Sequence, residues 1–524
     1  MERRKLPIGI QDFIGLRQDG FIYIDKTAFI YKLANAGKTY FLSRPRRFGK
    51  SLLLSTMAAY FRGKKELFQG LAIEQLEAQE AEPWKEHAVI RVDFSTDTFA
   101  IQGNLEKRID YFLQDLEQEY GTEKAGATFG VRFEHIIREA YKKSGRRVVV
   151  LIDEYDKPML DASGNAELSE TNREILRGFY SVLKGNDEYL RFVFFTGVTK
   201  FSKISIFSDL NQPDDISLTN NYATLCGITE NELEKNFRDE ITAMAEHNQM
   251  DRNQCLAKLR CMYDGYCFYQ NAERVYNPFS LLNALSKKDF NTYWFSTGTP
   301  TFLIKKLEKG EYDFRDFSNG ITADAKSLSD YRIDNPDPVP LFYQSGYLTI
   351  KEWNREYEEY TLRYPNDEVK YAFIESLAPT LYNVPASAPE LSISSFSKDI
   401  RKDNLEGVMN RFKALFARLP YTNSTGDKPL EYNFQNVIYI VFILLGKWSQ
   451  VEMHTAFGRA DCILKTEHTI YIFEFKRDGS VDEALAQIEQ KKYADAYTAD
   501  SRPVVKVGVS FSSAERNITD WKTT

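Results

Sequence analysis

The feature that most constrains the fold of this chain is a short apolar segment followed by a basic loop and a Gly-Lys-Ser triplet. The segment Thr39-Tyr-Phe-Leu42 is typical of a β-strand, and the residues after Ser51, Leu52-Leu-Leu-Ser-Thr-Met57, are typical of a helix. A strand, a tight loop and a helix opened by Gly-Lys-Ser form an arrangement in which helix N–H groups can hold an anion. We therefore predict a phosphate-binding loop, in which Lys50 reaches the β- and γ-phosphates of a nucleotide and Ser51 binds Mg²⁺.

The loop departs from the usual glycine-first pattern. Arg44 stands where the first glycine of G-x-x-x-x-G-K-[ST] falls, and Arg46 and Arg47 follow it. A Gly-Lys-Ser triplet alone could also be a helix start without a ligand, so the prediction needs a second element. The residues predicted to bind the nucleotide are Arg47, Phe48, Gly49, Lys50, Ser51 and Leu52.

The second element is Arg146-Arg-Val-Val-Val-Leu-Ile-Asp153-Glu154, an apolar run typical of a buried parallel strand with two carboxylates at its end. In open α/β sheets ligands bind at the carboxyl ends of the strands. We expect Asp153 to hold Mg²⁺ through water and Glu154 to polarise an attacking water. Paired acids after a strand also begin helices, but this order of elements favours the catalytic interpretation.

Two further strands are predicted, at residues 86–94 and at Leu190-Arg-Phe-Val-Phe-Phe-Thr196-Gly197. Thr196 is the expected γ-phosphate sensor, with Thr199 second, although a simple Thr-Gly turn is the alternative. Helices are expected at residues 105–120 and 133–142. This order predicts a parallel sheet in which the strand that carries the acids lies beside the strand that carries Thr196.

Composition limits the class of protein. The 524 residues, 43% of them apolar and 14% aromatic, predict two to four domains with large cores. The net charge of −7 argues against a protein that coats DNA, although not against a local basic groove. The chain has no signal-peptide core and no apolar run of about 18 residues, so no membrane segment is expected. Five cysteines without C-x-x-C spacing argue against structural zinc and indicate a reducing cytoplasm.

Four regions are expected. Residues 1–226 would form the P-loop domain. In it, an N-terminal strand and helix over residues 8–36 are expected to pack over the adenine. Asp25 or Thr27 would cap the helix that begins near Ala28. Residues 227–310 are predicted to form a helical lid. Residues 311–405 are expected to connect the lid to the rest, with a strand pair at 341–350 and 360–366 similar to a winged-helix hairpin and a linker at 386–397. Residues 406–524 complete the chain.

The last region, residues 406–524, carries a second group of candidate catalytic residues. A helix is predicted from Pro429-Leu-Glu431 to Leu445, followed by two strands, residues 450–464 and 470–476, that are joined at Thr466-Glu-His-Thr469. A two-residue turn at Glu467-His468 would place Asp461 opposite Glu474. Glu474 and Lys476 would then share a face, with Phe473 and Phe475 on the other.

Two adjacent carboxylates suit Mg²⁺ or Mn²⁺, so Asp461 and Glu474 are predicted metal ligands. Lys476 could orient or deprotonate a water, or stabilise the developing phosphoryl charge. Glu431 and, on a following helix with Lys491, Gln487 complete the predicted catalytic set. The alternative is a surface hairpin with a Glu474–Lys476 salt bridge.

With both sites described, the chain resembles the bacterial predicted AAA-ATPase-like proteins that end in a PD-(D/E)XK nuclease-type domain. The resemblance spans nearly the whole chain and rests on these segments: Gly9-Ile-Gln-Asp-Phe13, Tyr23-Ile-Asp-Lys-Thr27, Arg44-Pro-Arg-Arg-Phe-Gly-Lys-Ser51, Leu151-Ile-Asp-Glu-Tyr-Asp156, Tyr263-Asp-Gly-Tyr266, Tyr276-Asn-Pro278, Gly458-Arg-Ala-Asp461, Phe473-Glu-Phe-Lys476 and Gln487. It implies ATP binding through Gly49, Lys50 and Ser51, with Mg²⁺ and hydrolysis at Asp153 and Glu154. It also implies metal-dependent phosphodiester cleavage at Asp461, Glu474 and Lys476.

The hypothesis that follows is a multidomain ATPase coupled to a nuclease that acts on nucleic acid, with DNA favoured and a homo-oligomer left open. ATP binding would change the lid and gate the C-terminal site. The main alternative is a nucleotide-dependent switch or scaffold whose nuclease fold binds nucleic acid without cutting it. A GTPase-like or kinase-like transferase is disfavoured because the chain lacks a guanine-specificity motif and an H-R-D-like catalytic loop.

Overall fold

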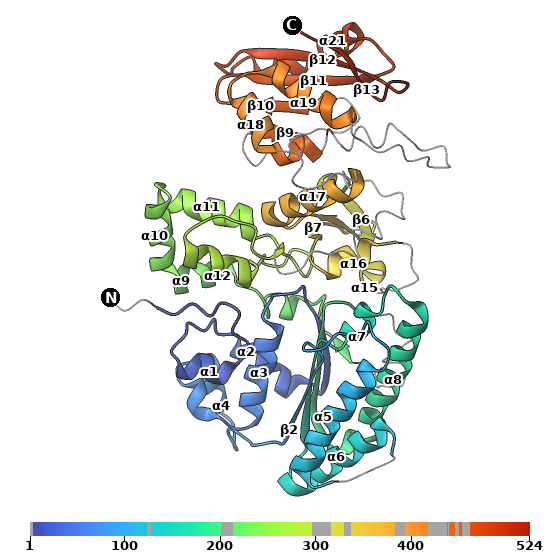
Figure 1. The fold of residues 1–524 in the computed structure, drawn as a ribbon. Coiled ribbons are helices and arrows are strands. Elements are labelled where there is room, and N and C mark those ends of the chain that lie inside the picture. Colours follow the sequence, from blue (N-terminus) through green and yellow to red (C-terminus); the bar gives the residue numbers. More distant parts are fainter. Residues whose placement is uncertain are drawn as a thin grey trace. The chain divides into compact units, whose positions relative to one another are not determined.

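The computed structural model describes residues 4–122, 127–200, 213–295, 316–329, 337–382, 393–417, 438, 440–445, 450–452 and 462–524. The chain divides into two compact units, Met1–Val369 and Lys370–Thr524 (Figure 1). Within the described ranges, no helix is long and apolar enough to cross a lipid bilayer.

A five-stranded parallel sheet with the order β2-β3-β4-β1-β5 forms the centre of the Met1–Val369 unit. Its strands are β1 (Thr39–Ser43), β2 (Val89–Asp93), β3 (Val148–Asp153), β4 (Leu190–Gly197) and β5 (Asp214–Asp215). Every residue of β3 is buried, as expected of a strand covered on both faces. The predicted adjacency is confirmed, because β3, which ends in Asp153, pairs with β4, which carries Thr196.

Helices cover both faces of this sheet (Figure 1). One group consists of α1 (Phe13–Gln18), α2 (Thr27–Ala36), α3 (Lys50–Phe61) and α4 (Ala72–Glu77), and the other of α5 (Asn104–Tyr120), α6 (Phe129–Ser144), α7 (Lys157–Asp161) and α8 (Ala166–Gly185). Helix α5 buries apolar residues three or four positions apart, which is the pattern that predicted it. Helix α6 begins four residues before its predicted start because the Thr128 side chain accepts a hydrogen bond from the Val131 N–H and caps it.

The N-terminal segment differs from the expectation in detail. The expected strand is reduced to a single parallel bridge between Lys5 and Phe21. Helix α2 begins at Thr27, with no side-chain cap at Lys26. Asp25 instead accepts hydrogen bonds from the Thr27 N–H at 2.8 Å and from the Thr27 hydroxyl at 2.6 Å. The carboxylate of Asp25, two residues before Thr27, therefore accepts the hydrogen bond of the first backbone N–H of the helix.

A helical layer follows the sheet domain, in the region predicted to form a lid, and we call this layer the lid. Its helices are α9 (Glu230–Asn236), α10 (Arg238–His247), α11 (Arg252–Tyr263) and α12 (Pro278–Lys287). They enclose an apolar core that includes Phe237, Leu259 and Leu281, and Ile8 and Ile24 of the N-terminal segment pack against it. Lys26 forms an ion pair with Glu232 of α9 at 2.7 Å, which ties the N-terminal segment to the lid.

The segment after the lid contains α14 (Asp316–Asn319), β6 (Ile321–Asp324), α15 (Ala325–Ser329), α16 (Val339–Gln344), β7 (Thr349–Asn354), β8 (Glu359–Arg363) and α17 (Asp367–Tyr382). Its strands form an antiparallel sheet with the order β6-β8-β7. The predicted strand at 341–350 is wrong in its first half, since residues up to Gln344 belong to α16. The proline at the start of α16 favours a helix, and burial of all six of its residues hides the periodicity.

The Lys370–Thr524 unit contains a second sheet with the order β13-β12-β11-β10-β9. Its strands are β9 (Gln450–Glu452), β10 (Cys462–Lys465), β11 (Ile470–Arg477), β12 (Val504–Ser512) and β13 (Asn517–Thr523), and its helices include α18 (Ile393–Arg401), α19 (Leu405–Ala417) and α21 (Val481–Gln490). The predicted linker at 386–397 is wrong from Ile393 onward, where α18 begins, and 386–392 lie outside the described residues. Of the helix predicted from Pro429 to Leu445, residues 438 and 440–445 are described and are helical. The single strand predicted over residues 450–464 is wrong, because β9 and β10 are two strands that pair antiparallel, with Lys465 opposite Gln450.

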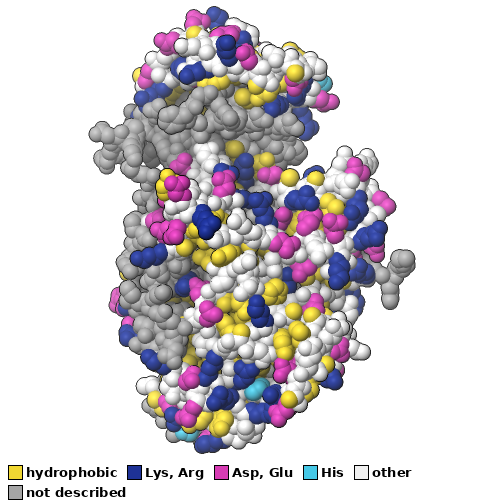
Figure 2. All heavy atoms as spheres, turned by 180° about the vertical axis from the view of Figure 1, so that it is seen from behind, with side chains coloured by type: hydrophobic (Ala, Val, Ile, Leu, Met, Phe, Trp, Pro, Cys, Tyr) yellow, Lys and Arg dark blue, Asp and Glu magenta, His cyan; other side chains and the backbone are white. Residues whose placement is uncertain are grey.

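The surface carries both signs of charge. On the face shown in Figure 2, Lys and Arg side chains are interspersed with Asp and Glu over the described residues. This mixture agrees with the sequence, which has 68 basic against 75 acidic residues.

Candidate active site

The 44–49 loop joins β1 to α3 and ends in a backbone conformation that favours glycine. Gly49 has a φ of 89° and precedes the first residue of α3, Lys50. A Cβ at Gly49 would meet nothing within 4 Å, so the helix N-terminus opens onto free space. Unpaired N–H groups at this end of α3 can therefore face an anion.

Lys50 and Ser51 line a cavity of about 500 Å³. The cavity is also lined by the predicted loop residues Arg47, Phe48, Gly49 and Leu52, and by Arg46 and Glu154. The Lys50 ammonium donates hydrogen bonds to the carbonyls of Arg44 at 2.9 Å and Pro45 at 3.1 Å. These bonds keep the charge over the concave side of the loop.

The ring of Phe48 points away from the cavity. It packs edge-on against Tyr266 and Phe268, with ring centroids 4.8 and 5.6 Å apart, and is 1% exposed. We therefore expect only the backbone of Phe48 to reach a nucleotide.

Asp153, Glu154 and Thr196 meet at the carboxyl ends of β3 and β4. The Thr196 hydroxyl donates a hydrogen bond to Asp153 Oδ1 at 2.6 Å, and both residues are buried. Glu154 turns toward the cavity with a φ of 49°, a conformation that costs a non-glycine residue about 1–2 kcal/mol. Burial raises the pKa of Glu154, and the nearby Lys50 charge opposes this rise. Such a carboxylate is suited to polarising water.

The turn after β4 is held by a residue to which the sequence analysis gave no role. Asp156 is buried, and its Oδ2 accepts hydrogen bonds from the N–H groups of Val198 at 3.0 Å and Thr199 at 2.6 Å and from the Thr199 hydroxyl at 2.7 Å. A Cβ on Gly197 would lie 2.4 Å from Asp156 Oδ1, so this packing requires glycine. Thr199 is thus engaged in supporting the strand end, whereas Thr196 faces the acid of β3.

The carboxylate of Asp153 suits a Mg²⁺ ion. Asp153 Oδ2 is buried and has no hydrogen-bond partner among the described residues. A hard, unsatisfied oxygen next to Glu154 and the cavity suits Mg²⁺, directly or through water. No group of three or more His, Cys, Asp or Glu side chains converges in the described part of the chain. A cation here would therefore take its other ligands from phosphates and water.

Much of the remaining lining of the cavity is apolar. It comes from the N-terminal segment, including Pro7 and Ile24, and from the lid, including Ile228, Pro278 and Phe279. A cavity lined by a cationic loop and by apolar side chains suits a nucleotide, which has charged phosphates and a base that packs on apolar surface.

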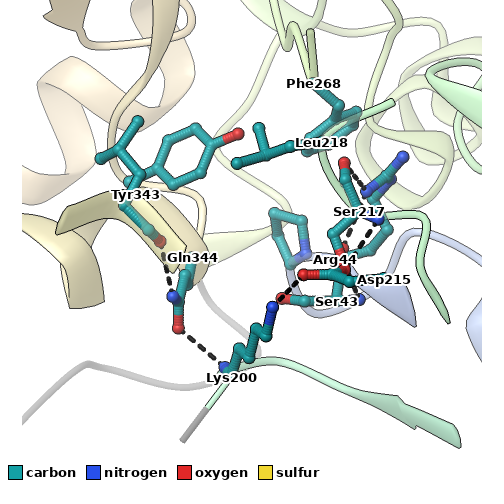
Figure 3. A pocket seen from close by; sticks show the side chains of 11 residues that line it. Ser43, Arg44, Lys200, Asp215, Ser217, Leu218, Phe268, Tyr343 and Gln344 are labelled. Atoms are coloured by element: carbon teal, nitrogen blue, oxygen red, sulfur yellow. Dashed lines mark hydrogen bonds and ion pairs between the residues drawn. The ribbon is translucent and has the colours of Figure 1, made fainter. Parts of the chain in front are cut away.

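Arg44 occupies the position of the usual first glycine of the loop, and its side chain is buried. Its guanidinium is 1% exposed, donates hydrogen bonds to the carbonyls of Ser43, Ser217 and Tyr222 at 2.8 to 3.0 Å, and lies 4.0 Å from the Phe268 ring centroid. Figure 3 shows Arg44 on one side of a cavity of about 30 Å³, across from Tyr343 and Gln344 of α16. Arg44 therefore joins the loop to distant elements and is not placed to bind phosphate.

Two more contacts hold the loop from the same side. A Cβ on Gly346, which has a φ of 91°, would lie 2.7 Å from Pro45 Cβ, so the backbone approaches the loop as closely as glycine allows. The Trp294 indole N–H donates a hydrogen bond to the carbonyl of Arg46 at 3.0 Å. No short-range pattern in the sequence indicates these contacts, because about 250 residues or more separate the partners.

In the Lys370–Thr524 unit, Glu474, Lys476 and Gln487 form a closed set of hydrogen bonds. Lys476 Nζ lies 3.2 Å from Glu474 Oε1, and the Gln487 amide bonds to both side chains. Gln487 reaches them because its helix, α21, packs tightly on β12. The closest approach is at Gly508, the strand partner of Glu474, where a Cβ would lie 2.6 Å from the Val481 carbonyl oxygen. Glu474 is 2% exposed, so the lysine charge supports a buried carboxylate.

The predicted register of the β10–β11 hairpin is confirmed. Cys462 pairs with Phe473 and Lys465 with Ile470, and the Thr466 N–H donates a hydrogen bond to the Thr469 carbonyl at 2.9 Å across the two-residue turn. Phe473 packs on the face opposite Glu474, with its ring centroid 5.1 Å from that of Phe442. The other two predicted members of this site, Asp461 and Glu431, lie outside the described residues.

The fold and the two sites define a P-loop NTPase domain followed by a PD-(D/E)XK-like α/β domain. A family model described as "Predicted AAA-ATPase" matches residues 7–207, and one described as "PD-(D/E)XK nuclease superfamily" matches residues 430–521. The chain is 38% identical to an "Uncharacterized protein in vnfD 5'region" of Azotobacter chroococcum mcd 1, over 99% of this chain and 98% of that one. It therefore belongs to the family of AAA-ATPase-like proteins that carry a PD-(D/E)XK nuclease superfamily domain.

Proposed function

We propose that the chain binds Mg²⁺-ATP in the 500 Å³ cavity and hydrolyses it, and that its C-terminal domain cleaves nucleic acid in an ATP-dependent manner, with DNA as the favoured substrate. The observation that carries the ATPase proposal is that Lys50, Ser51 and Glu154 line one cavity, together with apolar side chains of the N-terminal segment and the lid. The nuclease proposal rests on the buried Glu474 with Lys476 and Gln487 around it.

Each residue of the first site has a part in this proposal. Lys50 and the N-terminus of α3 bind the β- and γ-phosphates, and the apolar lining accepts the adenine. Ser51 and Asp153 would hold Mg²⁺, which when bound supplies charge neutralisation at the phosphates. Glu154 orients the attacking water, and Thr196 keeps Asp153 in place.

The ATPase proposal is tested by measuring ATP turnover and ADP affinity for the full chain. Lys50→Ala should weaken nucleotide binding and lower turnover by about 10²-fold or more, because it removes the main phosphate-binding cation. Glu154→Gln should keep ADP affinity while turnover falls by about 10²- to 10³-fold, since the amide cannot accept a proton. Lys64→Ala, at an exposed lysine, is the matched control and should match wild type. Wild-type turnover in Lys50→Ala would refute the assignment.

The nuclease proposal is tested with single-stranded DNA, double-stranded DNA and RNA, in Mg²⁺ or Mn²⁺, with and without ATP. Glu474→Ala should abolish cleavage and leave ATP turnover intact, whereas Lys50→Ala should alter cleavage only when ATP is present. Glu515→Ala, at an exposed carboxylate in the same unit, serves as the control. Absence of cleavage on every substrate with ATP turnover intact would instead support a nucleotide-dependent switch that binds nucleic acid.

A further inference from the structure

The three arginines of the 44–49 loop have different surroundings. The Arg44 side chain is buried under the loop, as described above. The Arg47 guanidinium lies 4.9 Å from the ring centroid of Phe279, on the lid side of the cavity. Arg46 is exposed, lines the cavity with Lys50 and Glu154, and its guanidinium has no hydrogen-bond or ion-pair partner in the described part of the chain.

The backbone of Arg46 is nevertheless fixed. Its carbonyl accepts the hydrogen bond from the Trp294 indole, and the preceding Pro45 packs against Gly346, where a Cβ would lie 2.7 Å from Pro45 Cβ. A cation whose backbone is held from behind and whose side chain reaches into the cavity is prepared for a ligand that brings negative charge.

The charge of Arg46 already acts at the end of the cavity where the reaction would take place. It opposes the rise in the pKa of Glu154 that burial causes, in the same sense as the charge of Lys50. Lys50, Arg46 and Glu154 line one cavity, and the two cations act on the carboxylate, so we place the terminal phosphate and the attacking water of the proposed ATPase reaction beside these three residues.

We propose that Arg46 is a catalytic arginine that acts in cis, contacting the γ-phosphate of the ATP bound by its own chain and stabilising the negative charge that develops there. This proposal rests on the proposed ATPase function. In the reaction, water attacks the γ-phosphorus, the bond from that phosphorus to the β,γ-bridging oxygen breaks, and the bridging oxygen stays on ADP. One proton of the water passes through Glu154 to solvent, so that ATP and water yield ADP, inorganic phosphate and a proton. Trp294 is then a positioning residue for Arg46.

The first test compares wild type, Arg46→Ala, Arg46→Lys and the control Arg146→Ala, at an exposed arginine beyond the other end of β3. Arg46→Ala should lower kcat by about 10³-fold. It should weaken binding of the non-hydrolysable analogue AMP-PNP by about tenfold and leave ADP affinity within twofold, since ADP lacks the γ-phosphate. Arg46→Lys should recover part of kcat. A kcat within twofold of wild type in Arg46→Ala would overturn the proposal.

The second test separates action in cis from action on a neighbouring chain. If Arg46 acts in cis, a mixture of the Arg46→Ala and Lys50→Ala chains has the summed activity of its components. If the mixture recovers activity beyond that sum, Arg46 serves another chain's nucleotide, and the assignment in cis is overturned.

The third test addresses Trp294. Trp294→Phe removes the indole donor and keeps an aromatic ring, so kcat should fall several-fold with ADP affinity unchanged. In the Arg46→Ala background, Trp294→Phe should cause no further loss, because the two residues act as one unit. Additive losses would overturn the positioning role. A wild-type chain that neither binds nor hydrolyses ATP would refute the proposed function itself, whereas an active wild type with an unaffected Arg46→Ala would refute only the role of Arg46.

Discussion

The two candidate sites differ in the length of chain that builds them. In the Met1–Val369 unit, the 44–49 loop is held by Ser217, Phe268, Trp294 and Gly346, which lie between about 170 and 300 residues further along. In the Lys370–Thr524 unit, Glu474, Lys476 and Gln487 come from one strand and the helix that follows it.

This difference has a physical consequence. A loop held by remote elements changes when those elements move, so the lid and the α16 region can influence nucleotide binding. A site within a strand–helix pair depends instead on register and on one close helix–strand contact. Substitutions remote in sequence should therefore affect the site around the 44–49 loop, whereas only substitutions in or near β11 and α21 should affect the site around Glu474.

The largest expected effect comes from Gly346→Val. The new side chain would collide with Pro45 and force a β-branched residue to a φ of 91°, so we expect the Met1–Val369 unit to lose about 2–4 kcal/mol of unfolding free energy. ATP affinity should fall at least tenfold although residue 346 is remote in sequence. Urea unfolding and nucleotide titration measure both, with Gly164→Val, where a Cβ meets nothing within 4 Å, as control. Unchanged ATP affinity in a folded Gly346→Val chain would show that the loop does not depend on remote support.

The local counterpart is Gly508→Ala. The added methyl would lie 2.6 Å from the Val481 carbonyl oxygen and displace α21, which should cost the Lys370–Thr524 unit about 2–3 kcal/mol. Any cleavage activity should be lost while ATP turnover stays at the wild-type level. Gly178→Ala, where a Cβ meets nothing within 4 Å, should be neutral or slightly stabilising. Retention of cleavage in Gly508→Ala would contradict the dependence of this site on the close contact between α21 and β12.

A pH-dependent effect is expected at Glu368, which is buried and accepts a hydrogen bond from the backbone N–H of Trp294 at 2.8 Å. Burial raises the pKa of Glu368 to about 7. Since the folded value lies above the unfolded value, this group stabilises the fold most below about pH 4.5, and that contribution is lost as the pH rises to about 7. Glu368→Gln should therefore add about 1–2 kcal/mol at pH 8 and much less at pH 5.

Unfolding of the Glu368→Gln chain and of wild type across this pH range measures the difference between them. An equal effect at pH 5 and pH 8 would contradict a raised pKa. Because Glu368 supports the segment that holds Arg46, the nucleotide affinity of wild type at low and high pH offers a second measure of remote control.

The smallest expected effects compare two helix caps of the same kind. Thr229 and Ser480 each form a capping box, at the starts of α9 and α21. Replacing either by alanine should cost about 1 kcal/mol. Thr229→Ala should also weaken nucleotide binding slightly through the lid, whereas Ser480→Ala should leave it unchanged. The reverse result would overturn the distinction between remote and local control.

Several features could be predicted from the sequence because they depend on short stretches of chain. Strands β3 and β4, the start of α3 at Lys50 and the register that opposes Cys462 to Phe473 follow from apolar runs, a Gly-Lys-Ser triplet and a two-residue turn. Each reflects backbone propensity or side-chain period, which act over a few residues. The boundaries were less reliable, as α16 and α18 show, because full burial hides periodicity and a short apolar run fits either kind of element.

By itself the sequence determined the two domain types, and it named the charged residues of each proposed site: Lys50, Asp153, Glu154, Glu474 and Lys476. Only the tertiary structure decided how the arginines of the loop are used. Arg44 and Arg46 are two residues apart and chemically identical, yet one is buried against Phe268 and the other faces the cavity. Local sequence cannot distinguish them, because the surroundings of each arginine come from residues that only the folded chain brings to the loop.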